Sequence, residues 1–121
     1  MTPGGASDYF ASAMLRHACD QCDVGLFEED PRVNPQSECK YGGYARERGD
    51  SRWTVEGRAA RLAAPMRFAR CSGGLSRASF FAVLEPKTGN ILLSGEISPT
   101  LIIGEGSTPV LEAGTSLAFL P

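Results

Sequence analysis

The amino-acid sequence predicts a mainly β fold: an antiparallel β-sandwich or partly open barrel with one short N-terminal helix. The chain has 121 residues, 42% of them hydrophobic, which is enough for one modest core. Its 14 glycines and 8 prolines indicate many turns and short elements. Short apolar segments recur at roughly 8–12-residue spacing with turn residues between them, as in sandwiches and barrels.

The helix is predicted close to the N terminus. Ser7 is a suitable N-cap, and Asp8 lies where the helix dipole favours a negative charge. Over residues 8–18, apolar and amphipathic side chains recur at helical spacing: Phe10, Ala13, Met14 and His17. Residues 1–6 precede this helix, and we expect them to form a flexible arm outside a single β-rich domain of residues 7–121.

The next segments alternate between a strand, a loop and a strand. Residues 23–27 predict a short strand, and the polar residues 28–40, which include two prolines, predict a long exposed loop. Residues 41–46 place two tyrosines around a glycine pair. This pattern predicts a strand that forms a bulge or lies close to another chain.

The middle of the chain is less regular. Residues 53–55 predict a strand, and residues 66–70 alternate apolar and basic side chains as a half-buried strand does. Between them, residues 56–64 are compatible with a helical turn or with a wide connection, and the sequence leaves both open.

The last third carries the clearest β signal. Residues 78–84 and 91–97 predict two strands, and the turn-forming residues 85–90 join them into a β-hairpin. Short strands are expected to follow at residues 101–103, 110–112 and 116–120.

Charge is distributed unevenly along the chain, although the net charge is only −2. Residues 40–77 contain nine basic and three acidic residues, a net charge of +6, so the remaining residues carry −8. Such polarity allows the acidic surface of one copy to pack against the basic surface of another. A solvated mixed surface explains the same distribution.

The sequence shows no sign of a leader or a membrane span. Residues 1–8 lack a basic cluster followed by an apolar run. No apolar stretch approaches the ~20 residues that a membrane span needs. We therefore expect neither a secretory precursor nor a membrane protein.

Four cysteines, Cys19, Cys22, Cys39 and Cys71, are candidate structural thiols or disulfide partners. Cys19 and Cys22 form a CxxC motif, but a zinc knuckle usually meets a second knuckle, and the chain has only one. No βαβ pattern surrounds the motif to suggest thioredoxin-like chemistry. We expect no bound metal and no cofactor, and the sequence does not choose among the possible pairings.

The pattern of reactive residues predicts a protein that is not an enzyme. His17 is the only histidine, and neither a nucleophile elbow nor a phosphate-binding glycine loop occurs. An acid, a base and a nucleophile that would converge on a substrate are therefore not evident.

Aromatic and basic residues cluster in the segment 41–53. Interface hot spots are enriched in these residue types, and stacking on single-stranded nucleic acid is the alternative. The acidic net charge favours a protein interface, for which the candidate residues are Tyr41, Tyr44, Arg46, Arg48, Arg52 and Trp53.

The order of these motifs resembles a family of small virion proteins of tailed bacteriophages, described as head-decoration or tail-fibre-like proteins. The resemblance runs along nearly the whole chain, except for residues 47–79 and the four cysteines. The matching segments are Ser7–Phe10 opening the helix, Val24–Phe27 followed by Pro31, Gly42–Arg46, Phe80–Leu84, Lys87–Gly95 and Leu111–Phe119.

This resemblance implies a β-rich, non-catalytic virion component that assembles in the cytoplasm of a host bacterium. The leading expectation is a capsid decoration, or cement, protein that binds the major capsid protein, forms a homo-oligomer on the particle and stabilises the head. A tail, baseplate or fibre-attachment protein is the first alternative. A zinc-stabilised nucleic-acid-binding module is the second, although neither nucleic acid nor a membrane is an expected partner.

Overall fold

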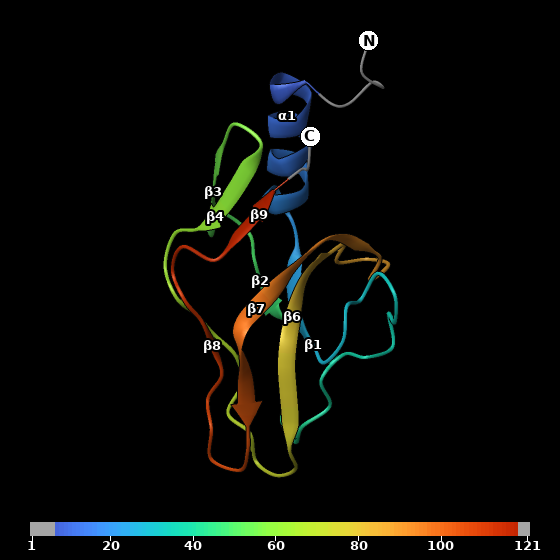
Figure 1. The fold of residues 1–121 in the computed structure, drawn as a ribbon, viewed down its shortest axis with the longest axis vertical. Helices are drawn as coiled ribbons and strands as arrows, with labels where there is room; N and C mark the ends of the chain where they lie inside the picture. Colours follow the sequence, from blue (N-terminus) through green and yellow to red (C-terminus); the bar gives the residue numbers. More distant parts are fainter. Residues whose placement is uncertain (1–6, 119–121) are drawn as a thin grey trace.

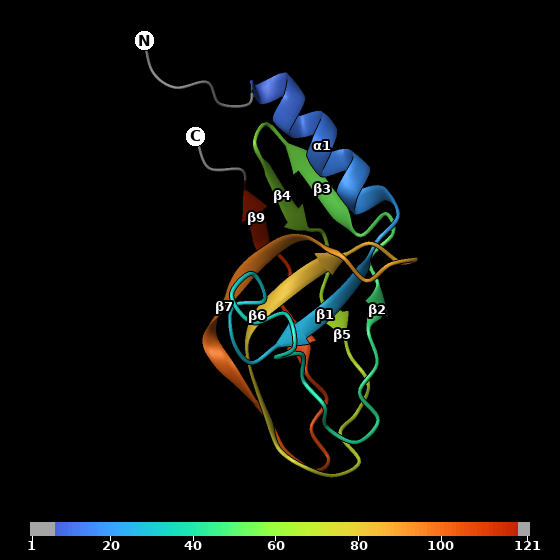
Figure 2. The same ribbon diagram turned by 90° about the vertical axis from the view of Figure 1, so that its right-hand side faces the viewer.

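The computed structural model describes residues 7–118 and confirms a mainly β fold with one N-terminal helix (Figures 1 and 2). The predicted arm, residues 1–6, and the last three residues lie outside the described part. The elements are α1 (Asp8–Asp20), β1 (Asp23–Phe27), β2 (Glu47–Arg48), β3 (Trp53–Glu56), β4 (Ala59–Leu62), β5 (Met66–Arg67), β6 (Ser76–Leu84), β7 (Ile91–Ile103), β8 (Val110–Leu111) and β9 (Ser116–Ala118).

The strands form three antiparallel sheets, and within residues 7–118 none of them closes into a barrel. The main sheet has four strands in the order β2-β1-β6-β7. A three-stranded sheet has the order β3-β4-β9, and β5 pairs with β8. In this part of the chain no helix has the length and apolar character needed to cross a membrane.

Helix α1 is predicted correctly, but it buries a different face from the one that the sequence pattern suggests. The Ser7 hydroxyl accepts a hydrogen bond from the Phe10 amide at 3.1 Å, which confirms the N-cap. The buried face consists of Ala11, Leu15 and Ala18, whereas Phe10 is exposed. Two small alanines on the buried side allow the helix to approach β3 and β4 closely (Figure 2).

The predicted β-hairpin is confirmed as β6 and β7, with the turn at residues 85–90. Strand β7 is longer than predicted, because it continues through residues 98–103 instead of ending and starting again. Ala78 pairs with Leu101 and Phe80 pairs with Glu96, so residues 97–100 of β7 form a bulge opposite the single residue 79 of β6. Thr100 meets Ser79 there in a 2.9 Å side-chain hydrogen bond.

Two other predicted strands differ from the structure. Residues 41–46 form a turn rather than a strand: the Tyr44 amide donates to the Tyr41 carbonyl at 3.0 Å, and Gly43 has a φ of 88°. Glycine adopts this left-handed conformation without a steric penalty. Of residues 66–70 only Met66–Arg67 are a strand. Residues 56–64 form neither a helical turn nor a wide connection: a tight turn at residues 57–58 joins β3 to β4, which itself lies within this range.

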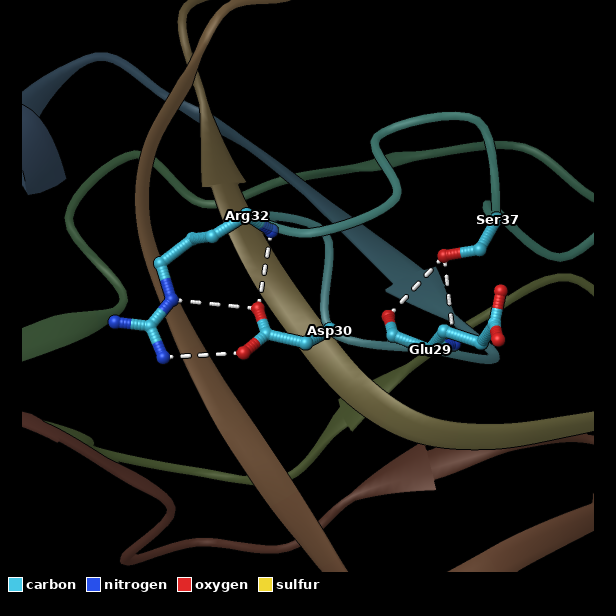
Figure 3. A network of polar contacts seen from close by, with 4 residues as sticks. All are labelled: Glu29, Asp30, Arg32 and Ser37. Atoms are coloured by element: carbon cyan, nitrogen blue, oxygen red, sulfur yellow. Dashed lines mark hydrogen bonds and ion pairs between the residues drawn. The ribbon is translucent and has the colours of Figure 1, made fainter.

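The predicted loop after β1 is present, but local hydrogen bonds hold it in place (Figure 3). The Asp30 carboxylate accepts from the backbone amide and the guanidinium of Arg32 at 3.0–3.3 Å. Ser37 donates its hydroxyl to the Glu29 carbonyl at 3.1 Å, and the Glu28 amide donates to the Ser37 carbonyl at 2.9 Å. The loop therefore closes on itself, and Val33 lies exposed on it.

The core joins all three sheets to the helix. The main cluster includes Leu15 of α1, Val24 of β1, Leu62 of β4 and Phe81 of β6, all at most 2% exposed. A smaller cluster around Phe27 fills the other face of β1 and β6. Both faces of β1 are thus buried.

Candidate functional site

The segment 41–53, predicted to be an interface, contributes two of its aromatic side chains to the core. Tyr41 is 4% exposed, and its hydroxyl donates to the Ala69 carbonyl at 2.6 Å. Trp53 is 9% exposed and stacks on Phe81 with 6.1 Å between ring centroids. Packing within the domain accounts for both residues, which argues against either as a contact with a partner.

Tyr44 and Arg46 hold a partly buried carboxylate, that of Glu38. The Tyr44 hydroxyl donates to Glu38 Oε2 at 2.6 Å and accepts from the Leu26 amide at 3.0 Å. Arg46 adds two hydrogen bonds of 2.8 Å, one to each oxygen of Glu38. This bidentate geometry is the strong form of an Arg–carboxylate pair. The Tyr44 hydroxyl, which contacts both Glu38 and Leu26, attaches the turn at residues 41–46 to β1.

The electrostatics of this network favour the ionised form of Glu38. Burial alone would raise the pKa of the carboxyl group. The hydrogen bonds from Arg46 and Tyr44 act in the opposite direction and hold the pKa below its usual value. Burial raises the pKa of the Tyr44 hydroxyl, and its hydrogen bond to Glu38 raises that pKa further.

The last two predicted interface residues, Arg48 and Arg52, have exposed side chains. Arg48 pairs with Asp50 at 2.8 Å, and Asp50 also accepts a hydrogen bond from the Cys22 amide at 2.9 Å. The six predicted residues are therefore divided between the core, the Glu38 network and the solvent. An interface role for the segment as a whole stays a prediction.

All four cysteines are buried and present as free thiols. Burial raises the pKa of Cys19 to about 11 and that of Cys22 to about 12. The CxxC motif starts in the last turn of α1, at the negative end of the helix dipole, whereas reactive thiolates are favoured at helix N-termini. These are the properties of structural thiols.

Cys39 and Cys71 lie on the segments that flank the Tyr41 turn. Burial raises the pKa of Cys39 to about 12, and the Cys71 thiol contacts the Gly73 carbonyl at 3.2 Å. Within residues 7–118, no group of three or more His, Cys, Asp or Glu side chains is arranged to hold a metal. The expectation of a metal-free protein stays a prediction.

Helix α1 presents large apolar side chains to solvent. Tyr9 is 86% exposed, Phe10 54% and Met14 41%. Phe10 and Met14 are four residues apart and therefore share one face of the helix. We call these three side chains the helix surface.

A cleft of about 340 Å³ continues the helix surface toward the C-terminal end of α1. Its apolar wall combines Met14 and Ala18 of the helix with Pro86, Leu92 and Leu93 of the β6–β7 hairpin. The polar residues that line it are His17, Asp20, Gln21, Glu85 and Lys87. A mainly apolar hollow with a few polar groups is typical of a binding site.

A second exposed apolar area lies at the start of β6 and the end of β7. Leu75 is 66% exposed and Ile102 is 60% exposed. Arg77, also exposed, pairs with Ile102 across the two strands, and Leu75 precedes it by two residues. Arg77 and Ile102 are directly opposite each other and therefore share one side of the sheet, and the exposed Leu75 lies just before β6. We call them the strand surface.

The helix surface and the strand surface lie at opposite ends of the domain. Figure 1 shows α1 at the top of the long axis, whereas β6 begins and β7 ends at the bottom. The sequence reasoning missed both surfaces. Apolar residues on a short helix or strand look the same whether a neighbouring element covers them or not. One signal was available for the helix, the spacing of Ala11, Leu15 and Ala18, which marks the face that packs.

Comparisons with known proteins do not assign the chain to a family. No family model matches the sequence, and no curated protein matches it. The resemblance to phage virion proteins therefore stays an expectation from the sequence motifs.

Proposed function

We propose that this chain is a non-enzymatic structural protein of a tailed bacteriophage particle, a decoration protein that binds the capsid and ties its subunits together. The observation that carries the proposal is the pair of exposed apolar surfaces at opposite ends of the domain. Contiguous exposed apolar side chains mark sites of protein association. A protein that connects subunits needs two such surfaces, whereas a simple ligand of one partner needs one.

The mainly β fold and the order of the sequence motifs support the same proposal. The strand surface combines two aliphatic side chains with Arg77, and arginine is enriched at interface hot spots. We assign attachment to the capsid to this surface. The capsid-bound copies would then present their helix surfaces away from the attachment point.

Reconstitution on empty shells tests the attachment. The probe is the major capsid protein encoded in the same genome, assembled into shells and incubated with the purified chain. Replacing Leu75→Ser and Ile102→Thr together should weaken binding roughly 100-fold, because each fully buried aliphatic side chain contributes about 1.5 kcal/mol or more. The control is Val33→Ser, which removes an even more exposed apolar side chain from the loop after β1 and should bind normally.

Copy number on purified particles separates a decoration protein from a tail protein. Quantitative gel analysis should find the chain in hundreds of copies per particle. A few to dozens of copies would place it in the tail or baseplate instead. Purified particles that lack the chain would contradict the virion role altogether.

A further inference from the structure

The outer face of α1 carries both a protrusion and a hollow. Phe10 projects from the N-terminal half of the helix with 54% of its surface exposed. The cleft beside Ala18 and Leu92 lies at the C-terminal half. Met14 lies midway between them, four residues after Phe10 and four residues before Ala18. Each step of four residues advances about 6 Å along the helix axis.

We propose that two copies of the chain associate through antiparallel α1 helices around a two-fold axis at Met14. In this arrangement the Phe10 ring of each copy enters the cleft of the other, and the two Met14 side chains meet at the axis. The equal spacing on either side of Met14 lets both clefts be filled at once. An isologous contact of this kind closes on itself and stops at a dimer. The inference does not depend on the virion role.

Charges at the ends of the helix favour the antiparallel orientation. Asp20 and Glu85 line the cleft, where they would face the positive end of the other copy's helix. A parallel arrangement would place like ends of the helices together.

The size of the contact predicts a weak dimer. Helix α1 has 13 residues and is about 20 Å long, so the buried area falls at the low end of specific interfaces. A weak self-association becomes effective when copies are held side by side, because the local concentration then reaches the millimolar range. Free protein should therefore show a concentration-dependent equilibrium.

Sedimentation equilibrium of the full chain tests the association. The wild type should shift from monomer to dimer as its concentration rises, and Phe10→Ser should raise the dissociation constant at least about tenfold. Val33→Ser is the matched control, with an exposed apolar side chain on a distant loop. Circular dichroism should be unchanged in both variants, because neither side chain belongs to the core.

Cross-linking tests the position of the axis. Met14→Cys should form a covalent dimer with oxidised glutathione, whereas Leu75→Cys, at the other end of the domain, should not. The native thiols are buried, so the wild type should stay monomeric on a non-reducing gel. Equal cross-linking of the two variants, or a wild type that remains monomeric at millimolar concentration, would overturn the proposal.

Discussion

The segment 41–53 and helix α1 both carry aromatic side chains, but the structure uses them in opposite ways. Tyr41 and Trp53 are buried, and Tyr44 reaches into the fold to hold Glu38. Tyr9 and Phe10 of α1 extend into solvent instead. Residue type alone therefore does not distinguish an interface from a core, because both environments favour large aromatic groups.

Polar partners explain why the two tyrosines of the segment 41–53 are buried, whereas Trp53, whose Nε1 has no hydrogen-bond partner among the described residues, is buried through its stacking on Phe81. A buried Tyr hydroxyl requires a hydrogen-bond partner, and Tyr41 and Tyr44 find theirs at Ala69, Glu38 and Leu26 inside the domain. Phe10 has no polar group on its side chain, and 54% of its surface is exposed. Its exposed surface is the kind of apolar area that association with another chain removes from water.

The largest expected effect is the loss of a core aromatic. Trp53→Ala removes the ring that stacks on Phe81 and should lower the free energy of unfolding by about 3–5 kcal/mol. Phe10→Ser should change it by less than about 0.5 kcal/mol, since exposed positions tolerate substitution. Urea denaturation followed by circular dichroism measures both. Similar losses in the two variants would contradict the division into core and surface.

A smaller loss is expected at Gly25, where β1 approaches the Glu38 network. A Cβ atom there would lie 2.9 Å from Glu38 Oε2 and 3.2 Å from the Tyr44 hydroxyl. Gly25→Ala should therefore destabilise the fold by about 2–3 kcal/mol through overpacking. Gly73→Ala is the control, because nothing lies within 4 Å of its Cβ position. If Gly25→Ala unfolds at the same temperature as the wild type, the Glu38 and Tyr44 side chains can move to accommodate the extra methyl group, and the prediction is wrong.

Removing one hydroxyl from the network should have a more modest effect. Tyr44→Phe leaves the ring in place but deprives Glu38 of a donor and the Leu26 amide of its acceptor. We expect a loss of about 1–2 kcal/mol, the usual cost of an unsatisfied buried group. Chemical denaturation checks the value, and full stability in Tyr44→Phe would contradict a structural role for the hydroxyl.

The pH dependence of stability should reveal the ion pair. The pKa of Glu38 is lower in the folded chain than its unfolded value of about 4.3, so its contribution is complete above that pH. As pH falls through the folded pKa, the carboxylate gains a proton and the contribution is lost. The stability difference between wild type and Arg46→Gln should therefore shrink below about pH 4. A difference that stays constant from pH 7 to pH 3 would exclude this origin.

Local signals in the sequence predicted helix α1 and the β6–β7 hairpin. Ser7 marked the start of α1, and the breakers at residues 85–90 marked the β6–β7 turn, because both effects act within a few residues. The continuation of β7 past Pro99 was not predicted, since a proline usually ends a strand. Here the bulge opposite Ser79 accommodates it. Whether a strand continues past a proline depends on its pairing with a strand that is distant in the sequence.

The binding surfaces were harder to predict for the same reason. Tyr41 and Trp53 look like interface residues until their contacts with Ala69 and Phe81, far along the chain, are known. Phe10 and Met14 look like a packing face until Ala11 and Leu15 are seen to occupy that role. Burial depends on which segments meet, and local spacing does not contain that information.

Fluorescence of Trp53, the only tryptophan in the chain, tests the central division most directly. Its indole is buried in the free domain, so its emission should be blue-shifted and poorly quenched by acrylamide. Binding to capsid shells should leave both properties unchanged if, as we propose, the capsid contacts lie on the strand surface. A tryptophan that is readily quenched in the free protein and becomes protected on the shells would contradict the account and restore the segment 41–53 as the interface.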